Sequence, residues 1–310
     1  MKVYHKLEEL QSIRRPVVTT GTFDGVHLGH RKIIDNLIQS ARELDGESVL
    51  FTFYPHPRMI LNPEDQNLQL LNTQSEKIDL LAKAGIDHLV IYPFSTEFAS
   101  ITAEAFVKEI LVEAIGATKL VIGYDHRFGH KREGNFEQLR LLSKSYPFEV
   151  EEIPPKDLDQ INISSTKIRN ALFAGDVETA NHFLGYSYQL TGVVLAGNRL
   201  GRTIGFPTAN VQPTYKHKLI PGNGVYAVQV LASGISYPAM LNIGYRPTIN
   251  AIADKPTIEA HLFNFDGNLY DTEVTISFIH RLRDERKFQN LDELKEQLER
   301  DKQHAIQKLS

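Results

Sequence analysis

The pattern of strand and helix signals changes near Gly185, and this change constrains the fold more than any other feature. Upstream, short apolar strands are predicted at 16–20, 48–53, 88–92 and 119–122, with helix-periodic segments at 29–44 and 102–115 between them. Strands separated by helices predict a parallel, doubly wound α/β sheet. A length of 310 residues fits two domains. We therefore predict one domain over residues 1–185 and a second over 186–310.

The second half reads as a small all-β domain. Short strands are predicted at 189–195, 225–231, 237–243, 258–263 and 274–279, with Gly, Pro and Asn turns between them. This spacing favours an antiparallel barrel or a sandwich. A terminal helix follows, with one predicted apolar stripe made of Leu291, Leu294, Leu298, Ile306 and Leu309. We interpret this helix as a structural cap rather than a partner-binding helix.

Composition excludes several classes of protein. With 34 Lys and Arg against 38 Asp and Glu, the net charge of −4 argues against a nucleic-acid-binding protein, although a local basic patch stays possible. The chain has no cysteine, so disulfides, thiolate metal sites and a cysteine nucleophile are excluded. The charged N-terminus and the lack of long apolar runs predict a cytoplasmic protein without a signal peptide or membrane span.

A glycine- and histidine-rich turn, GTFDGVHLGH, follows the first predicted strand over residues 21–30. Free N–H groups and the helix dipole make a helix start a natural phosphate site. Gly29 would allow a phosphate close to the backbone, and both His27 and His30 could donate hydrogen bonds. We place Gly21 and Phe23 in the same phosphate site. Two alternatives stay open, namely a plain glycine-rich turn with exposed histidines and a histidine metal pair, for which no third ligand is near in sequence.

A second candidate phosphate segment is ISSTKIR, over residues 163–169. Two serines precede an apolar run, as expected at the start of a helix. Hydroxyls and two cations in one turn could hold a polyphosphate, and the residues that would do so are Ser164, Ser165, Thr166, Lys167 and Arg169. The alternative is ordinary helix capping with solvated charges.

The second half carries a glycine-spaced loop followed by FPTAN. The loop could wrap phosphates with backbone amides through Gly197, Gly201, Arg202 and Gly205. In an extended segment Thr208 and Asn210 would face the same way, and their oxygens suit Mg²⁺. An exposed polar strand face is the alternative. Glu259 lies in an alternating strand and shares a face with His261, so it would serve as a general base if it pointed into a site.

The first-half motifs resemble the nucleotidylyltransferase superfamily. The strings FYPHP at 53–57 and GYDHRFG at 123–129 make the chain similar to the FAD synthetase half of the bifunctional riboflavin kinase/FMN adenylyltransferase family. This resemblance implies a Rossmann-like domain that transfers the adenylyl group of ATP to FMN. It also implies flavin contacts from Asp125, Arg127 and Phe128.

The second half resembles the flavokinase part of the same family through GNRLGRTIGFPTAN, MLNIGYRPT and RDERKF. The resemblance implies a six-stranded flavin-binding barrel closed by the terminal helix. It implies Thr208 and Asn210 on Mg²⁺, Glu259 as catalytic base, and flavin contacts from Arg286 and Phe288. The sequence departs from the family at Asp271, where Gly is common, and this departure suggests a different turn near the Glu259 strand.

The expected activity is therefore bifunctional. ATP would phosphorylate riboflavin to FMN and then adenylylate FMN to FAD, with ATP, riboflavin and FMN as the only partners and a monomer or weak homo-oligomer as the working state. The alternatives are a chain with one active half, a non-catalytic flavin sensor or carrier, and another nucleotidylyltransferase with an unrelated β domain.

Overall fold

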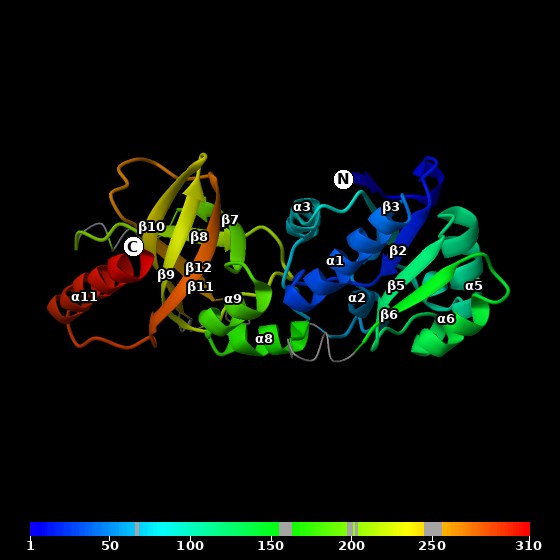
Figure 1. The fold of residues 1–310 in the computed structure, drawn as a ribbon. Helices are drawn as coiled ribbons and strands as arrows, with labels where there is room; N and C mark the ends of the chain where they lie inside the picture. The colour runs from blue at the N-terminus through cyan, green and yellow to red at the C-terminus, as the bar shows by residue number, and fades with distance from the viewer. Residues whose placement is uncertain (66–67, 155–162, 197–200, 202–203, 245–255) are drawn as a thin grey trace. The chain divides into compact units, whose positions relative to one another are not determined.

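The computed structural model describes residues 1–65, 68–154, 163–196, 201, 204–244 and 256–310 (Figure 1). The chain divides into two compact units, Met1–Ser165 and Thr166–Ser310. The two helices just before residue 185 fall in the second unit, and hydrogen bonds show why. Asn181 Nδ2 donates to the Phe278 carbonyl at 2.8 Å, and the Gly222 amide donates to the Leu172 carbonyl at 2.8 Å. The domain boundary at residue 185 stays a prediction.

The first unit alternates strands and helices as predicted. Its elements are β1 (Lys2–Tyr4), η1 (Leu7–Glu9), β2 (Pro16–Thr20), α1 (Leu28–Glu43), β3 (Glu47–Tyr54), α2 (Pro57–Leu61), α3 (Gln74–Ala84), β4 (His88–Pro93), α4 (Thr96–Ala99), α5 (Ala103–Ala105), η2 (Phe106–Ala114), β5 (Lys119–Gly123), η3 (His130–Arg132), α6 (Phe136–Leu142) and β6 (Glu149–Ile153). The predicted helix at 102–115 forms as α5 followed by the π-helical η2. The sequence reading did not include β1 or β6.

The six strands of this unit form one parallel sheet in the order β1-β4-β3-β2-β5-β6. After β1 at one edge, the chain crosses to β2 at the centre, moves outward through β3 to β4, and returns to add β5 and then β6 on the other side. The carboxyl ends of β2 and β5 therefore form a switch point, where ligands of open α/β sheets usually bind. The fold class predicted for this half is confirmed.

Alternation along the strands builds an apolar layer on each face of the sheet. Val17 and Val121 pack with Leu37 and Ala41 of α1, while Val18 belongs to the large core against α5, η2 and α6. A capping box begins α3, with the Thr73 hydroxyl accepting from the Glu76 amide and the Glu76 carboxylate accepting from the Thr73 amide. This box fixes where α3 begins.

The second unit contains two helices, a six-stranded barrel and a terminal helix. Its elements are α8 (Ser165–Phe173), α9 (Val177–Leu184), β7 (Gln189–Leu195), β8 (Ala209–Pro213), β9 (Gly224–Ala232), β10 (Ile235–Gly244), β11 (Thr257–Leu262), β12 (Glu273–Arg283) and α11 (Leu291–Leu309). The strands close in the order β10-β11-β8-β7-β12-β9, all antiparallel. Closure leaves no free sheet edge, and the predicted barrel is confirmed.

The terminal helix α11 packs through part of the predicted stripe, since Leu298 and Leu309 lie against an apolar cluster that includes barrel residues. Ala305 is fully buried in a cluster with Phe206 and Met240, whereas Leu291 and Ile306 are exposed. Asp301 is buried on the same packed face because it accepts three hydrogen bonds of 2.7–3.0 Å from the Arg283 guanidinium of β12. The ion pair therefore decides how the helix sits on the barrel.

Candidate functional site

The first candidate site is the turn between β2 and α1. His27 is the N-cap of α1, and its Nδ1 accepts a hydrogen bond from the His30 amide at 3.3 Å. A neutral imidazole that accepts at Nδ1 carries its proton on Nε2, so His27 remains a donor on its other side. Phe23 and Val26 have φ of 47° and 35°, an uncommon conformation for residues with a side chain. Such strain is typical of turns shaped for a function.

The two histidine rings of this turn lie face to face. Their centroids are 3.6 Å apart at an interplanar angle of 15°, and the Phe23 ring lies 5.0 Å from His30. Burial, helped by the nearby charges of His27 and Lys77, holds the pKa of His30 well below its usual 6.5. Its Nδ1 is buried without a hydrogen-bond partner in the part of the chain that the structure describes. The lowered pKa therefore favours a neutral His30 imidazole, with one buried ring nitrogen that has no partner among the described residues.

The structure brings the predicted phosphate segments together. A Cβ added at Gly29 would lie 3.2 Å from His27 Nδ1 and 3.8 Å from the Ile163 carbonyl. The Ser165 hydroxyl donates to the Asp24 carbonyl at 2.9 Å. The start of ISSTKIR thus contacts the GTFDGVHLGH turn, and Ser164 is exposed beside it along the chain. The remaining predicted residues, Thr166, Lys167 and Arg169, lie on the first turns of α8.

The GYDHRFG segment follows β5 at the same sheet edge. His126 Nε2 and the Thr20 hydroxyl at the end of β2 lie 3.0 Å apart, so the two strand ends meet at the switch point. The Phe128 ring stacks on His126 at 5.7 Å and 19°. Burial and the charge of Arg132 lower the pKa of His126 to about 4, which keeps the ring neutral at pH 7. Asp125 and Arg127 are exposed.

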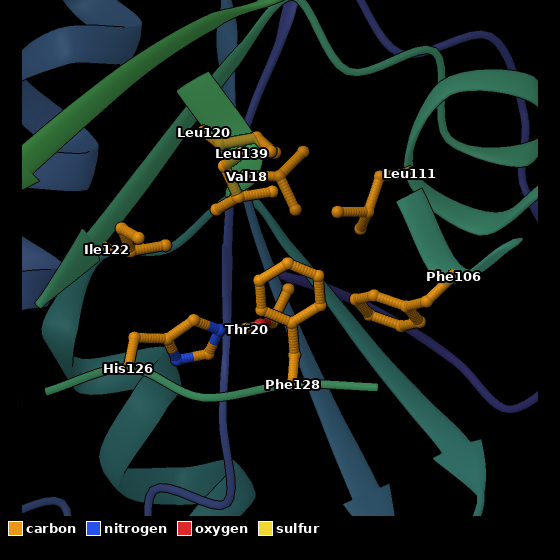
Figure 2. A pocket seen from close by; sticks show the side chains of 9 residues that line it. All are labelled: Val18, Thr20, Phe106, Leu111, Leu120, Ile122, His126, Phe128 and Leu139. Carbon is orange, nitrogen blue, oxygen red and sulfur yellow. Dashed lines mark hydrogen bonds between the residues drawn. The ribbon is translucent and has the colours of Figure 1, made fainter. Parts of the chain in front are cut away.

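Phe128 and His126 line a small cavity of about 10 Å³, enough room for about one water molecule (Figure 2). Its other lining residues are Val18, Thr20, Phe106, Leu111, Leu120, Ile122 and Leu139. Thr20 and His126 supply the polar atoms of an otherwise apolar wall. Most of these residues belong to the apolar core of the unit, so the cavity is a small gap in that core.

The sequence reading missed two buried charged residues that support the first site. Asp24 accepts hydrogen bonds from the Leu71 and Asn72 amides just before α3. Lys77, on α3, donates from Nζ to the Thr22 carbonyl at 2.9 Å. The spacing of Lys77 and Leu81 could have indicated this burial. Residues four positions apart lie on one face of a helix, and here that face is buried.

The second candidate site lies across three neighbouring barrel strands. Register places Glu259 of β11 opposite Asn210 of β8 on one side and opposite Asn242 of β10 on the other. The Thr208 hydroxyl donates to Glu259 Oε2 at 3.5 Å. The three predicted residues Thr208, Asn210 and Glu259 therefore form one cluster. Within it, the Glu259 carboxylate lies beside the Thr208 hydroxyl.

Neighbouring residues hold this cluster. His261 is buried beneath Phe206, and its Nδ1 lies 2.7 Å from the Pro207 carbonyl, which fixes the residue before Thr208. A Cβ at Gly201 would lie 2.2 Å from the Phe206 carbonyl, so only glycine fits where the loop returns. Gly205 has φ of 85°. The predicted phosphate-binding residues Gly197 and Arg202 lie outside the described residues.

The predicted flavin contacts of the barrel lie in the segment between β12 and α11. The Arg286 guanidinium lies over the Phe288 ring, 4.7 Å from its centroid, and Arg283 lies 5.9 Å from the same ring. Asn242 Nδ2 donates to Glu285 Oε1 at 3.4 Å, so this segment also reaches the strand next to Glu259. Asp271 has φ of 61°, the left-handed conformation that glycine favours, so aspartate adopts it here.

No group of three His, Cys, Asp or Glu side chains that could hold a metal ion occurs among the described residues. The chemistry of the Thr208, Asn210 and Glu259 cluster is different, since it offers a hydroxyl, an amide and a carboxylate. These all-oxygen donors fit Mg²⁺, which also retains water and phosphate ligands.

Comparisons with known proteins agree with this division. A family model described as FAD synthetase matches residues 10–167, and one described as riboflavin kinase matches residues 184–309. The chain is 40% identical over 289 residues to the bifunctional riboflavin kinase/FMN adenylyltransferase of Haemophilus influenzae, which covers 93% of this chain and 92% of the relative. It is 36% identical to the Bacillus subtilis enzyme of the same name over 310 residues, 99% and 96% of the two chains.

A solved structure also matches along the whole length. A crystal structure of a protein named macrolide-efflux protein from Streptococcus pneumoniae has a TM-score of 0.89 and 31% identity, and the match covers 98% of each chain. Among the described residues of the present chain, no helix has the length and apolar character needed to cross a membrane. The two family models and the curated relatives, over nine-tenths of each chain, show that the protein belongs to the bifunctional riboflavin kinase/FMN adenylyltransferase family.

Proposed function

We propose that the two activities of this riboflavin kinase and FMN adenylyltransferase use two separate nucleotide sites. The GTFDGVHLGH turn would hold ATP for adenylyl transfer, and the Thr208, Asn210 and Glu259 cluster would hold it for phosphorylation. The observation that carries the proposal is that each unit holds its own cluster of functional side chains, and that the two clusters differ in chemistry. His27 and His30 stack in the first unit, whereas Glu259 lies beside Thr208 in the second.

In the barrel, Glu259 would accept the proton of the ribityl 5′-hydroxyl of riboflavin as that oxygen attacks the γ-phosphorus of ATP. The new bond is O–Pγ, the bond to the ADP oxygen breaks, and the products are FMN, ADP and the proton on Glu259. Thr208 and Asn210 would hold Mg²⁺, which, when bound, offsets negative charge on the phosphates. The backbone amides of the loop that contains Gly201 and Gly205 would position the triphosphate.

In the first unit, an FMN phosphate oxygen would attack the α-phosphorus of ATP, and pyrophosphate would leave. A phosphate monoester is largely ionised at pH 7, so this step needs no strong base. That requirement matches a site whose central groups are two histidines rather than a carboxylate. Neutral His30 and the Nε2 donor of His27 would stabilise the developing charge through hydrogen bonds, with Gly21, Phe23 and Gly29 shaping the approach. Ser164 and Ser165, which adjoin the turn, would add hydroxyl groups.

The flavin would bind in two different surroundings. In the first unit, the cavity lined by Phe128 and His126 lies at the ends of β2 and β5 (Figure 2). The GYDHRFG segment beside it would contact FMN through Asp125 and Arg127, which are exposed, and through the edge of Phe128. In the barrel, Phe288 and the overlying Arg286 would contact riboflavin.

The experiment is chromatography of flavins after incubation of the pure protein with magnesium ATP and either riboflavin or FMN. Both conversions should occur, and a chelator should stop them. Conversion of only one substrate would indicate one active half. Tight flavin binding with neither substrate changed would indicate a sensor or carrier.

We further propose that the protein works in the cytoplasm as a monomer or weak homo-oligomer and binds no nucleic acid. The near-neutral charge balance, with a net charge of −4, supports the absence of a nucleic-acid partner. Light scattering over a hundredfold range of concentration tests the oligomeric state.

A further inference from the structure

Lys77 is a buried lysine whose position the proposed mechanism does not use. Its exposure is 6%, and lysine is almost never this buried without a partner. The capping box at Thr73 and Glu76 starts α3 just before it, so the helix geometry directs its side chain toward the sheet. The ammonium donates to the Thr22 carbonyl at 2.9 Å. A positive charge from α3 therefore touches the turn that carries His27 and His30.

The charged and titratable groups that face Lys77 come from this turn and from α1. Asp24 attracts the ammonium electrostatically, while His30, with His27 stacked on it, lies close enough for the charge of Lys77 to lower the pKa of His30. Asp24 also accepts from the Leu71 and Asn72 amides. The turn and the start of α3 are thus tied together at Thr22 and at Asp24.

Burial makes this arrangement electrostatically costly. It lowers the pKa of Lys77 to about 8, even though Asp24 opposes the shift, so the group is charged at pH 7 but titrates just above it. An ammonium has three N–H donors, and a carbonyl satisfies one of them. A desolvated cation is stabilised when an anion binds nearby. Nucleotide phosphates on the turn would provide that anion.

We propose that Lys77 is a positioning residue for adenylyl transfer, holding the Thr22–Asp24 part of the turn and supplying a buried positive charge that stabilises nucleotide phosphates bound there. The proposal rests on the proposed placement of ATP at this turn. It has two consequences. Phosphate binding raises the pKa of Lys77, and the charge of Lys77 adds to burial in disfavouring the cationic form of His30.

The first test compares Lys77→Met with Lys83→Met, a matched loss of charge at an exposed position on the same helix. We expect Lys77→Met to raise the KM for ATP in FMN adenylylation about 10- to 100-fold, the cost of a lost charged hydrogen bond. Riboflavin phosphorylation, measured in the same sample, should be unchanged. In the wild type, kcat/KM for adenylylation should fall above about pH 8, and this alkaline limb should be absent in Lys77→Met and retained in Lys83→Met.

The second test is a titration of the wild-type protein, so it does not depend on the folding of a variant. In wild-type protein labelled with ¹³C at lysine Cε, the pKa of Lys77 should rise when magnesium pyrophosphate is added. An unchanged Lys77 pKa at saturating pyrophosphate would overturn the inference. So would a Lys77→Met protein whose KM and pH profile match those of Lys83→Met.

A His30→Ala variant separates this inference from the proposed function. If His30→Ala retains full adenylylation, ATP does not use this turn and the proposed site is wrong. If His30→Ala loses adenylylation while Lys77→Met behaves like Lys83→Met, the site stands and only the role of Lys77 is wrong.

Discussion

The two candidate sites are built in different ways. The turn in the first unit takes its main groups from ten consecutive residues where one strand ends and one helix begins. Lys77 of α3 and the Leu71 amide hold this turn through Thr22 and Asp24. The barrel site takes Asn210, Glu259 and Asn242 from three strands that are adjacent only through register. A local site depends on the conformation of one short segment, whereas a cross-strand site depends on the packing of the whole barrel.

The two sites also differ in the chemical groups that they contain. An alcohol must lose a proton to attack phosphorus, and the barrel site contains a carboxylate beside Thr208. A phosphate is already an anion, and the first site contains stacked imidazoles and a buried ammonium. Four variants follow in order of decreasing effect: the first two test whether the sites are separate, and the last two test what holds each unit together.

Glu259→Ala should lower riboflavin phosphorylation about 100- to 10,000-fold, because it removes the general base. Conversion of added FMN to FAD should continue at the wild-type rate. Chromatography of both reactions measures this, with Glu273→Ala, an exposed glutamate at the start of β12, as the control. Full kinase activity in Glu259→Ala would mean that another group accepts the proton.

His30→Ala should have the opposite pattern. Loss of one transition-state donor should lower adenylylation about 100- to 1000-fold, so that FMN accumulates from riboflavin. The control is His5→Ala, an exposed histidine in the same unit. If FAD still formed at the wild-type rate, or if kinase activity fell equally, the two-site description would be wrong.

Asp301→Ala should destabilise the barrel by about 2–3 kcal/mol, less than for a fully buried pair because the Arg283 side chain keeps 20% exposure. The segment with Arg286 and Phe288 lies next to Arg283, so the KM for riboflavin should also rise. Denaturant unfolding and kinase assays measure both effects. Glu296→Ala, which breaks the exposed pair with Arg300, should cost less than about 1 kcal/mol, and equal effects of the two variants would contradict the role of Asp301.

His126→Phe should change how the stability of the first unit depends on pH. Because the pKa of His126 is about 4 when folded and 6.5 ordinarily, the unfolded chain binds more protons between these values. The stabilisation is complete above pH 6.5 and is lost as the pH falls toward 4. The variant should reduce this pH-dependent change in the free energy of unfolding by about 1–2 kcal/mol. Some pH dependence should remain, because the pKa of His30 is also lowered. Hydrogen exchange of β2 and β5 amides at pH 5 and 7 measures it, and an unchanged slope would contradict the assignment.

Much of this organisation could be predicted from residues close together in the sequence. The change near Gly185, the strands at 16–20 and 119–122, the Thr73 capping box and the barrel strands all follow from local periodicity and turn residues, and the structure contains them. The strands β1 and β6 were not predicted, since β1 has three residues and β6 reads EVEEI, so neither contains an apolar run.

The sequence by itself determined the two fold classes, the histidine turn at the start of α1, and the presence of Thr208, Asn210 and Glu259 in a glycine-bordered region. The tertiary structure decided which way Glu259 points, that Lys77 and Asp24 support the histidine turn, and that Asp301 rather than Leu291 or Ile306 faces the barrel. The physical reason is the range of the interactions. Helix caps and turns form between residues a few positions apart, whereas strand register and the pairing of buried charges join residues tens of positions apart and exist only once the chain is packed.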